Sequence, residues 1–278
     1  MNAFVKQFIT KSKINLTAVA LLLGILLVGA ARVSAQQNSL VSDNRYQPSP
    51  NFSSALVSEG ERGAKFRYVS MKGSDDINVQ FYVTTALALA AGFDINTANS
   101  IGLYNQYVDD NPKTSATSNL FNFKARRDYH FTSEKQRAKL WQAFVAAPNA
   151  ANLGIFMHAN QDSFFHAGYN YVIGHMFKGV RPDQSWRPEN AVKSKNAARA
   201  IFEKMLEATP LLGAIVKPLD YADIEPQTLD FLNAADDSER GIRFARLVGR
   251  ISTLRGGQSD DTQLALTHIF RAIITYSF

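Results

Sequence analysis

Three side chains that can bind a metal ion are spaced four residues apart near the middle of the chain: His158, Asp162 and His166. Each residue of an α-helix turns the chain by about 100°, so a step of four moves the side chain round by only about 40°. If this run is helical, all three side chains leave one face of the helix. Neutral imidazole and carboxylate are ordinary zinc ligands, and this spacing lets one helix supply several of them. The stretch therefore predicts a metal site.

The histidines of the chain gather around this stretch. There are five, and four of them fall within 46 residues, at His130, His158, His166 and His175. A histidine that stands by itself in a helix, as His268 does, is more often a packing or surface residue than a ligand. The clustering, with the adjacent pair Asp109 and Asp110 a short way upstream, favours one shared site.

Asp162 lies among apolar residues, which makes its burial costly unless the carboxylate has a partner. A metal ion is one such partner. The alternative is an arginine from elsewhere in the chain, and Arg126 or Arg127 could supply it.

Apolar spacing and capping residues predict the helices that would position these side chains. Asp94, Ser133 and Asn149 or Asn152 are expected N-caps, and Gly92 is an expected helix end. Residues 111–131 are expected to form a long loop. The expected helices span 76–91, 94–107, 133–147, 149–168, 188–208, 226–234, 237–252 and 259–275.

No hairpin signal follows residue 72, so residues 73–278 are predicted to form a single all-α, metal-binding domain of about seven helices. Residues 36–72 are polar and rich in turn formers, with one short β-like stretch at 66–70. They are interpreted as an extended leader.

The first 35 residues have the pattern of a secretory signal peptide: a basic start, an apolar stretch from Thr17 to Ala31, and small residues before Ala35. The prediction is an exported protein, periplasmic or secreted, with no transmembrane span after cleavage; the alternative is an uncleaved anchor. Cleavage removes four of the 30 basic residues and none of the 24 acidic ones, which leaves a net charge of +2. That charge does not support a nucleic-acid partner.

The chain has no cysteine. An exported protein without disulfides must be held together by its core, and the mature length suffices for that. A bound metal ion must be held by histidine, carboxylate or backbone oxygen.

The order His158-x3-Asp162-x3-His166, followed by Gly174-His175, resembles the superfamily of zinc-dependent phospholipases C and single-strand-specific nucleases, and in particular an uncharacterised bacterial branch of it. Further fragments that carry the resemblance are Thr84 with Ala90 to Phe93, Gln106 to Asp110, Tyr129 to Phe131, and Pro182-Asp183. These span about half of the mature chain. The resemblance implies an all-α phosphodiesterase with a zinc cluster.

Carried over residue by residue, the resemblance implies that the helix and the loop after it supply the ligands His158, Asp162, His166 and His175. His130 and one of Asp109 and Asp110, with Asp110 taken as the ligand, would come from the upstream segment.

The sequence departs from the pattern of the superfamily at three ligand positions. Gln80 stands where a histidine is usual, Gly179 where a glutamate is usual, and Gln36 at the predicted mature N-terminus where the characterised enzymes have tryptophan. One or two zinc ions are therefore expected in place of three.

The hypothesis is an exported zinc-dependent hydrolase that acts on a phosphoester substrate, phospholipids included. Water on the metal would attack phosphorus, with whichever of Asp109 and Asp110 is not a ligand as general base. Arg126 and Arg127 could neutralise phosphate, or could be two solvated charges. One alternative is a non-catalytic binding module with a structural or degenerate metal site. Another is a helical protein whose cluster binds no metal.

Overall fold

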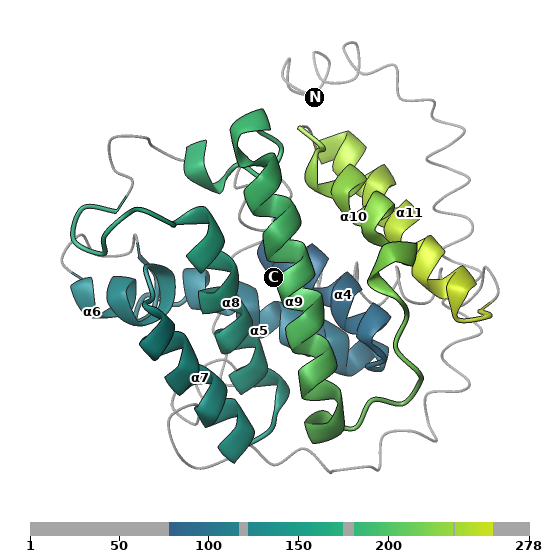
Figure 1. The fold of residues 1–278 in the computed structure, drawn as a ribbon, viewed down its shortest axis with the longest axis horizontal. Helices are drawn as coiled ribbons and strands as arrows, with labels where there is room; N and C mark the ends of the chain where they lie inside the picture. Colours follow the sequence, from purple (N-terminus) through teal and green to yellow (C-terminus); the bar gives the residue numbers. More distant parts are fainter. Residues whose placement is uncertain (1–77, 117–121, 175–180, 236, 258–278) are drawn as a thin grey trace, which may run out of the picture. The chain divides into compact units, whose positions relative to one another are not determined.

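The architecture is helical throughout the part of the chain seen in a computed structural model, which describes residues 78–116, 122–174, 181–235 and 237–257. These ranges contain eight α-helices and no strand, which confirms the predicted all-α class (Figure 1). The predictions for the signal peptide, the leader, His175, Gly179, His268 and the helix at 259–275 lie outside the described residues.

The helices run in the following order, with short π- and 3₁₀-helical turns between some of them. They are η2 (Asn78–Val83), α4 (Thr84–Ala91), α5 (Ile95–Asp110), α6 (Phe123–Ala125), η3 (Arg126–His130), α7 (Glu134–Ala146), α8 (Ala150–Phe165), η5 (Arg181–Asp183), η6 (Pro188–Asn190), α9 (Ala191–Leu212), η7 (Tyr221–Asp223), α10 (Glu225–Leu232) and α11 (Asp237–Leu254). None of the helices in the described ranges is long and apolar enough to span a bilayer.

The predicted helix starts are confirmed by their caps. The Asp94 carboxylate accepts the N–H groups of Asn96 and Thr97 at the start of α5. Ser133 does the same for α7, and Asn149 for α8. Each cap satisfies an N–H group that has no partner within the helix, which is worth about 1 kcal/mol.

Two segments differ from the prediction. The region 111–131, expected to be a loop, contains α6 and η3, and η3 is a π-helical turn that ends at His130. Helix α9 continues to Leu212 although Pro210 lies inside it. Proline has no N–H to give to the carbonyl four residues earlier. The hydroxyl of Thr209 donates to that carbonyl, Leu206 O, at 2.8 Å, so the helix continues without leaving it unpaired.

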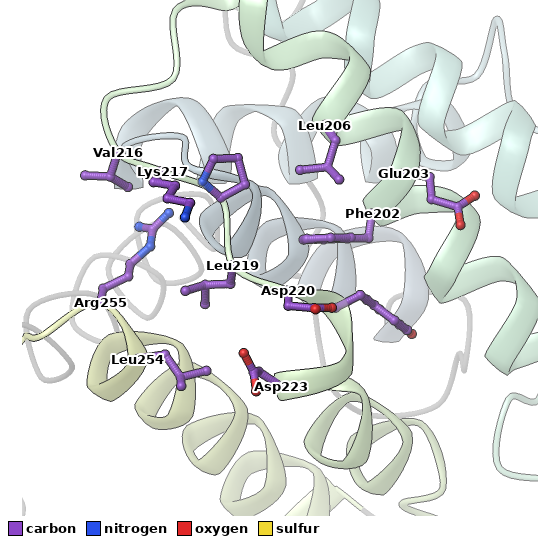
Figure 2. A pocket seen from close by; sticks show the side chains of 12 residues that line it. Phe202, Glu203, Leu206, Val216, Lys217, Leu219, Asp220, Asp223, Leu254 and Arg255 are labelled. Carbon is purple, nitrogen blue, oxygen red and sulfur yellow. The ribbon is translucent and has the colours of Figure 1, made fainter.

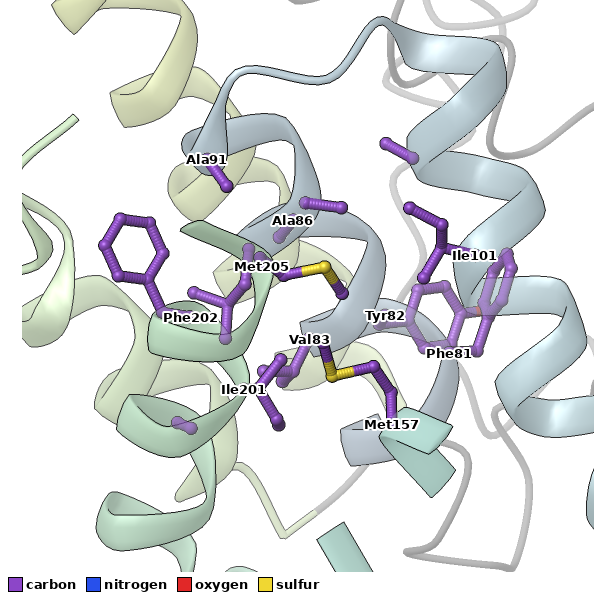
Figure 3. Packing of buried hydrophobic residues seen from close by; sticks show 14 of the residues in the cluster. Phe81, Tyr82, Val83, Ala86, Ala91, Ile101, Met157, Ile201, Phe202 and Met205 are labelled. Carbon is purple, nitrogen blue, oxygen red and sulfur yellow. The ribbon is translucent and has the colours of Figure 1, made fainter. Parts of the chain in front are cut away.

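The core lies around α4, all eight residues of which are buried. Its neighbours are η2, α5, α9 and α11. Figure 3 shows Val83 and Met157 facing Ile201 and Met205 of α9 across this core. Burial of each such apolar side chain contributes about 1.5–3 kcal/mol to the stability of the fold. This core holds in place the helices that carry the polar cluster.

Helices α5 and α8 make the most extensive helix–helix contact, and they approach closely at Gly154. A Cβ atom there would lie 2.6 Å from Ile101 O and 2.7 Å from Tyr104 Cβ. The absence of a side chain at Gly154 therefore sets the close distance between the two helices that carry the candidate ligands.

Candidate metal centre

Three elements bring the candidate ligands together. Asp109 is the penultimate residue of α5, His130 is the last residue of η3, and His158 and Asp162 are one turn apart on α8. Both histidines are almost fully buried, with 2% of the His130 side chain and none of the His158 side chain exposed. The helix-face prediction for His158 and Asp162 is therefore confirmed, because both side chains reach the same cluster.

Asp109, His130 and His158 form a group that could hold a metal ion. His130 Nδ1 lies 3.1 Å from His158 Nε2, and Asp109 Oδ1 lies 3.6 Å and 3.7 Å from these two nitrogens. Ligand atoms about 2.1 Å from a tetrahedral zinc ion are about 3.4 Å apart. The three observed spacings bracket that value.

Backbone carbonyls determine which ring nitrogens carry hydrogen. His130 Nε2 lies 2.8 Å from Thr114 O, and His158 Nδ1 lies 3.0 Å from Asn105 O. A carbonyl oxygen can only accept, so these two nitrogens are the donors. In neutral rings, His130 Nδ1 and His158 Nε2 are then the atoms with free lone pairs. Metal-binding histidines are commonly held in this way, with the second nitrogen donating to a carbonyl.

Asp162 contacts the same pair of nitrogens. Its Oδ2 lies 3.0 Å from His130 Nδ1 and 3.3 Å from His158 Nε2. Its Oδ1 accepts a hydrogen bond from Gln80 Nε2 at 3.2 Å. Among the described residues, the partners of the Asp162 carboxylate are imidazole and amide groups. Neither Arg126 nor Arg127 is among them.

The charges of the cluster depend strongly on one another. Burial alone would lower the pKa of His158, but the carboxylates of Asp162 and Asp109 outweigh it and raise the pKa above 6.5. Burial alone would raise the pKa of Asp162, but His158 and His166 outweigh it and hold that pKa well below 3.8. Asp162 is therefore ionised at neutral pH. The cluster favours a positive charge between its members.

Asp109 differs from Asp162 in its surroundings. Removal of water around its carboxylate, partly offset by the nearby histidines, raises its pKa. The side chain nevertheless keeps 26% of its surface exposed, against 7% for Asp162. Its Oδ2 is buried and has no hydrogen-bond partner among the described residues. Asp109 thus lies on the most accessible side of the cluster.

His166 lies beside the cluster with a different set of contacts. Its Nδ1 lies 3.1 Å from His130 O and 3.6 Å from Asp162 Oδ2, and its Nε2 lies 2.9 Å from Asp183 Oδ1. Burial opposes protonation, but Asp162 and Asp183 outweigh it and raise the pKa of His166 to about 9. His166 is therefore a cation in this arrangement, and its role as a ligand stays a prediction.

The structure places Asp109, and not Asp110, with the histidines. Asp110 is exposed at the end of α5, and the group that could hold a metal does not include it. The two residues are adjacent and so point about 100° apart on the helix. The metal-competent group therefore contains Asp109, where the resemblance implies Asp110 as the ligand.

The two arginines lie outside the metal-competent group. Arg127 is exposed and pairs with Asp128 at 2.8 Å, as the solvated-charge alternative predicts. Arg126 lies over the ring of Phe131, which in turn stacks on His166 with centroids 4.5 Å apart. No contact in the described residues joins either guanidinium directly to His130 or His158.

A buried polar network supports the helices that carry the cluster. Asn105 Nδ2 donates to Thr84 Oγ1 at 2.9 Å and to Gln161 Oε1 at 2.8 Å, and Gln161 Nε2 donates to Thr84 Oγ1. These three residues join α4, α5 and α8. The network fixes Asn105, whose carbonyl orients His158.

Sequence reasoning missed several of these groups. Asp183 was noted as part of the resemblance but not as the partner of His166, and the carbonyls of Asn105 and Thr114 carry no sequence signal. Gln80, which stands where the resemblance implies a histidine, lies at the cluster and donates to Asp162.

Comparisons with known proteins add one partial match. The model of a family of unknown function (DUF6765) matches residues 76–149, which include Gln80, Asp109 and His130 but not α8. No curated protein matches the chain. No solved structure matches it either.

Proposed function

We propose that Asp109, His130 and His158 bind a divalent transition-metal ion, with zinc as the ion their donor set fits, and that the protein is a hydrolase of phosphoester bonds. Two imidazole nitrogens and a carboxylate oxygen are the ligand set of many catalytic zinc sites. The same proposal includes export to the periplasm or the medium, which rests on the signal-like pattern of residues 1–35.

The observation that carries the proposal is the facing pair of ring nitrogens. His130 Nδ1 and His158 Nε2 are 3.1 Å apart, and the carbonyls behind them keep the hydrogens on the opposite nitrogens. Two lone pairs and two carboxylates repel one another unless a cation lies among them. A metal ion can accept both nitrogen lone pairs and neutralise both carboxylates. A single shared proton can join only one pair of these atoms.

The exposure of Asp109 supports a catalytic use of the site. A catalytic zinc site has three protein ligands and a position open to water, whereas a structural site is closed by four. An ion in such a site supplies Lewis acidity and lowers the pKa of bound water. The buried histidines would fix the ion from within, and Asp109 would hold it on the accessible side.

The carboxylate of Asp162 would accept a proton from the attacking water. Its Oδ2 lies beside both ring nitrogens, and Gln80 donates to its other oxygen and holds it in place. This is the role that the sequence suggested for Asp109 or Asp110. The choice of a phosphoester as substrate rests on the resemblance to zinc-dependent phospholipases C and nucleases.

The position of Asp162 also favours a second candidate, a structural metal site in a non-catalytic binding module. Its Oδ2 lies 3.0 Å and 3.3 Å from the two ring nitrogens, closer than Asp109 Oδ1 at 3.6 Å and 3.7 Å, so it could serve as a fourth ligand that closes the site. Activity separates the two candidates.

The test is hydrolysis of bis(4-nitrophenyl) phosphate by the zinc-loaded protein. An enzyme releases nitrophenol, loses that activity in His158→Ala and on chelation, and keeps it in the control Asp110→Asn. Stoichiometric zinc without hydrolysis of this diester or of 4-nitrophenyl phosphate would support the structural candidate and refute the hydrolase.

A further inference from the structure

A second site lies between the C-terminal half of α9, the segment 216–223 and the end of α11. The structure has a cavity of about 850 Å³ there, within the range of small-molecule sites (Figure 2). Its walls share no residue with the metal centre. Whatever it binds is therefore separate from the proposed hydrolase chemistry.

One part of the cavity wall is apolar. Phe202 and Leu206 of α9 face Leu219 and Leu254 across it (Figure 2). Phe202 is part of the core and has 2% of its surface exposed, so this wall is anchored to the core. An apolar ligand body would be desolvated against it at about 25 cal/mol per Å² of surface removed from water.

Two cationic side chains, Lys217 and Arg255, line the cavity. Figure 2 shows the Lys217 ammonium and the Arg255 guanidinium pointing toward one another. In the described part of the chain neither has an ion pair, and the Arg255 guanidinium donates only to the backbone carbonyl of Leu89. The Arg255 Nε is buried without a hydrogen-bond partner there, and burial lowers the pKa of the guanidinium. A partly buried guanidinium with a second positive charge in the same cavity wall is stabilised by an anion.

Three carboxylates, Glu203, Asp220 and Asp223, belong to the same wall. None of them forms an ion pair with Lys217 or Arg255, and Figure 2 shows them on the other side of the cavity. They repel a second negative charge at that side. The wall therefore selects a ligand with one anionic end and an apolar or cationic remainder.

We propose that this cavity binds a small amphiphilic monoanion, with a carboxylate held by Arg255 and Lys217 and an apolar chain lying against Phe202, Leu206, Leu219 and Leu254. A guanidinium can bind a carboxylate through two parallel hydrogen bonds, which are about twice as strong as neutral ones. Lys217 is exposed and contributes as a point charge.

The test is calorimetric titration of the full chain with octanoate and with octanamide, its uncharged counterpart of the same shape. The proposal predicts saturable binding of one octanoate, at least about tenfold tighter than octanamide. Arg255→Gln lowers octanoate affinity by about tenfold or more and Lys217→Gln by about threefold, because the second charge is solvated. The exposed residue Lys139 on α7 gives the control Lys139→Gln, which changes neither.

The octanamide titration also reports whether each variant keeps the cavity. Octanamide affinity that is unchanged in Arg255→Gln, beside weakened octanoate binding, supports the proposal. Equal affinity for the two ligands, octanoate affinity unchanged in Arg255→Gln, or no binding of octanoate at all would each overturn it. None of these outcomes depends on the metal, so the titration gives the same result in the presence of a chelator.

Discussion

The Nδ1 atom of His130 and the Nε2 atom of His158 lie 3.1 Å apart, with their rings nearly perpendicular at 89°. The opposite nitrogen of each ring faces a backbone carbonyl, Thr114 O or Asn105 O. The backbone therefore holds two buried imidazoles in an orientation that serves a shared cation. Asp109 and Asp162 add negative charge at the same place.

Asp109 and Asp110 are adjacent carboxylates with opposite expected effects on the metal. Asp109→Ala removes one of the three proposed ligands and is predicted to weaken zinc binding by more than about 100-fold. This loss exceeds the one expected when a residue that only hydrogen-bonds to a ligand is removed. Asp110→Ala is predicted to change affinity by less than about threefold, because its side chain is exposed. Competition titration with a coloured zinc chelator measures both. Equal losses in the two variants would contradict the assignment.

Zinc affinity is predicted to fall as the pH is lowered, because His130 and His158 bind the ion only through unprotonated nitrogens. The raised pKa of His158 means that protons begin to compete above pH 6.5, the ordinary value for histidine. Zinc binding near and below neutral pH should release protons, seen in calorimetry as a heat that depends on the ionisation enthalpy of the buffer. A heat that is independent of the buffer at pH 6.5 and below would be inconsistent with a protonated His158 that loses its proton to bind zinc.

Gly154 and Gly241 provide a matched pair of helical glycines. At Gly154 a Cβ atom would lie 2.6 Å from Ile101 O, whereas at Gly241 a Cβ atom would meet no other described part of the chain within 4 Å. Gly154→Ala is predicted to destabilise the protein by about 1–3 kcal/mol through overpacking, and to weaken zinc binding because α5 and α8 move apart. Gly241→Ala is predicted to be neutral or to stabilise by up to about 1 kcal/mol. Urea unfolding of both variants gives the comparison, and a stable Gly154→Ala would refute the close crossing.

The network of Thr84, Asn105 and Gln161 is predicted to stabilise the same crossing. Gln161→Met keeps the shape of the side chain but removes the hydrogen bonds that Gln161 makes with Asn105 Nδ2 and Thr84 Oγ1. The expected cost is about 1–3 kcal/mol in the free energy of unfolding. Gln142→Met, at an exposed position on α7, should cost less than about 0.5 kcal/mol. If both variants unfold at the same urea concentration, the buried network contributes nothing measurable.

Local signals sufficed for much of the fold. Asp94, Ser133 and Asn149 cap helices where their residue types and the apolar spacing placed them. The turn at Arg126–His130 was missed because a π-helical turn has no distinct sequence pattern. Helix α9 extends beyond the predicted end at residue 208 and passes through Pro210, a residue type that normally interrupts a helix, because the hydroxyl of Thr209 compensates for the missing N–H.

The site was less predictable than the helices. The four-residue spacing was enough to bring His158 and Asp162 to one cluster, because helix geometry is regular. Which of Asp109 and Asp110 joins them depends on the rotation of α5 against α8, which the packing at Gly154 determines. The pairing of His166 with Asp183 depends on the path of the chain after α8. Such relationships arise from tertiary structure and leave no local signal.

The zinc content of the purified full chain tests the central claim most directly. After loading with zinc and extensive dialysis, elemental analysis should find about one ion per chain in the wild type and almost none in the double variant His130→Ala, His158→Ala. A wild-type protein that retains no zinc, or a double variant that retains as much as the wild type, would contradict the assignment of this cluster as a metal centre.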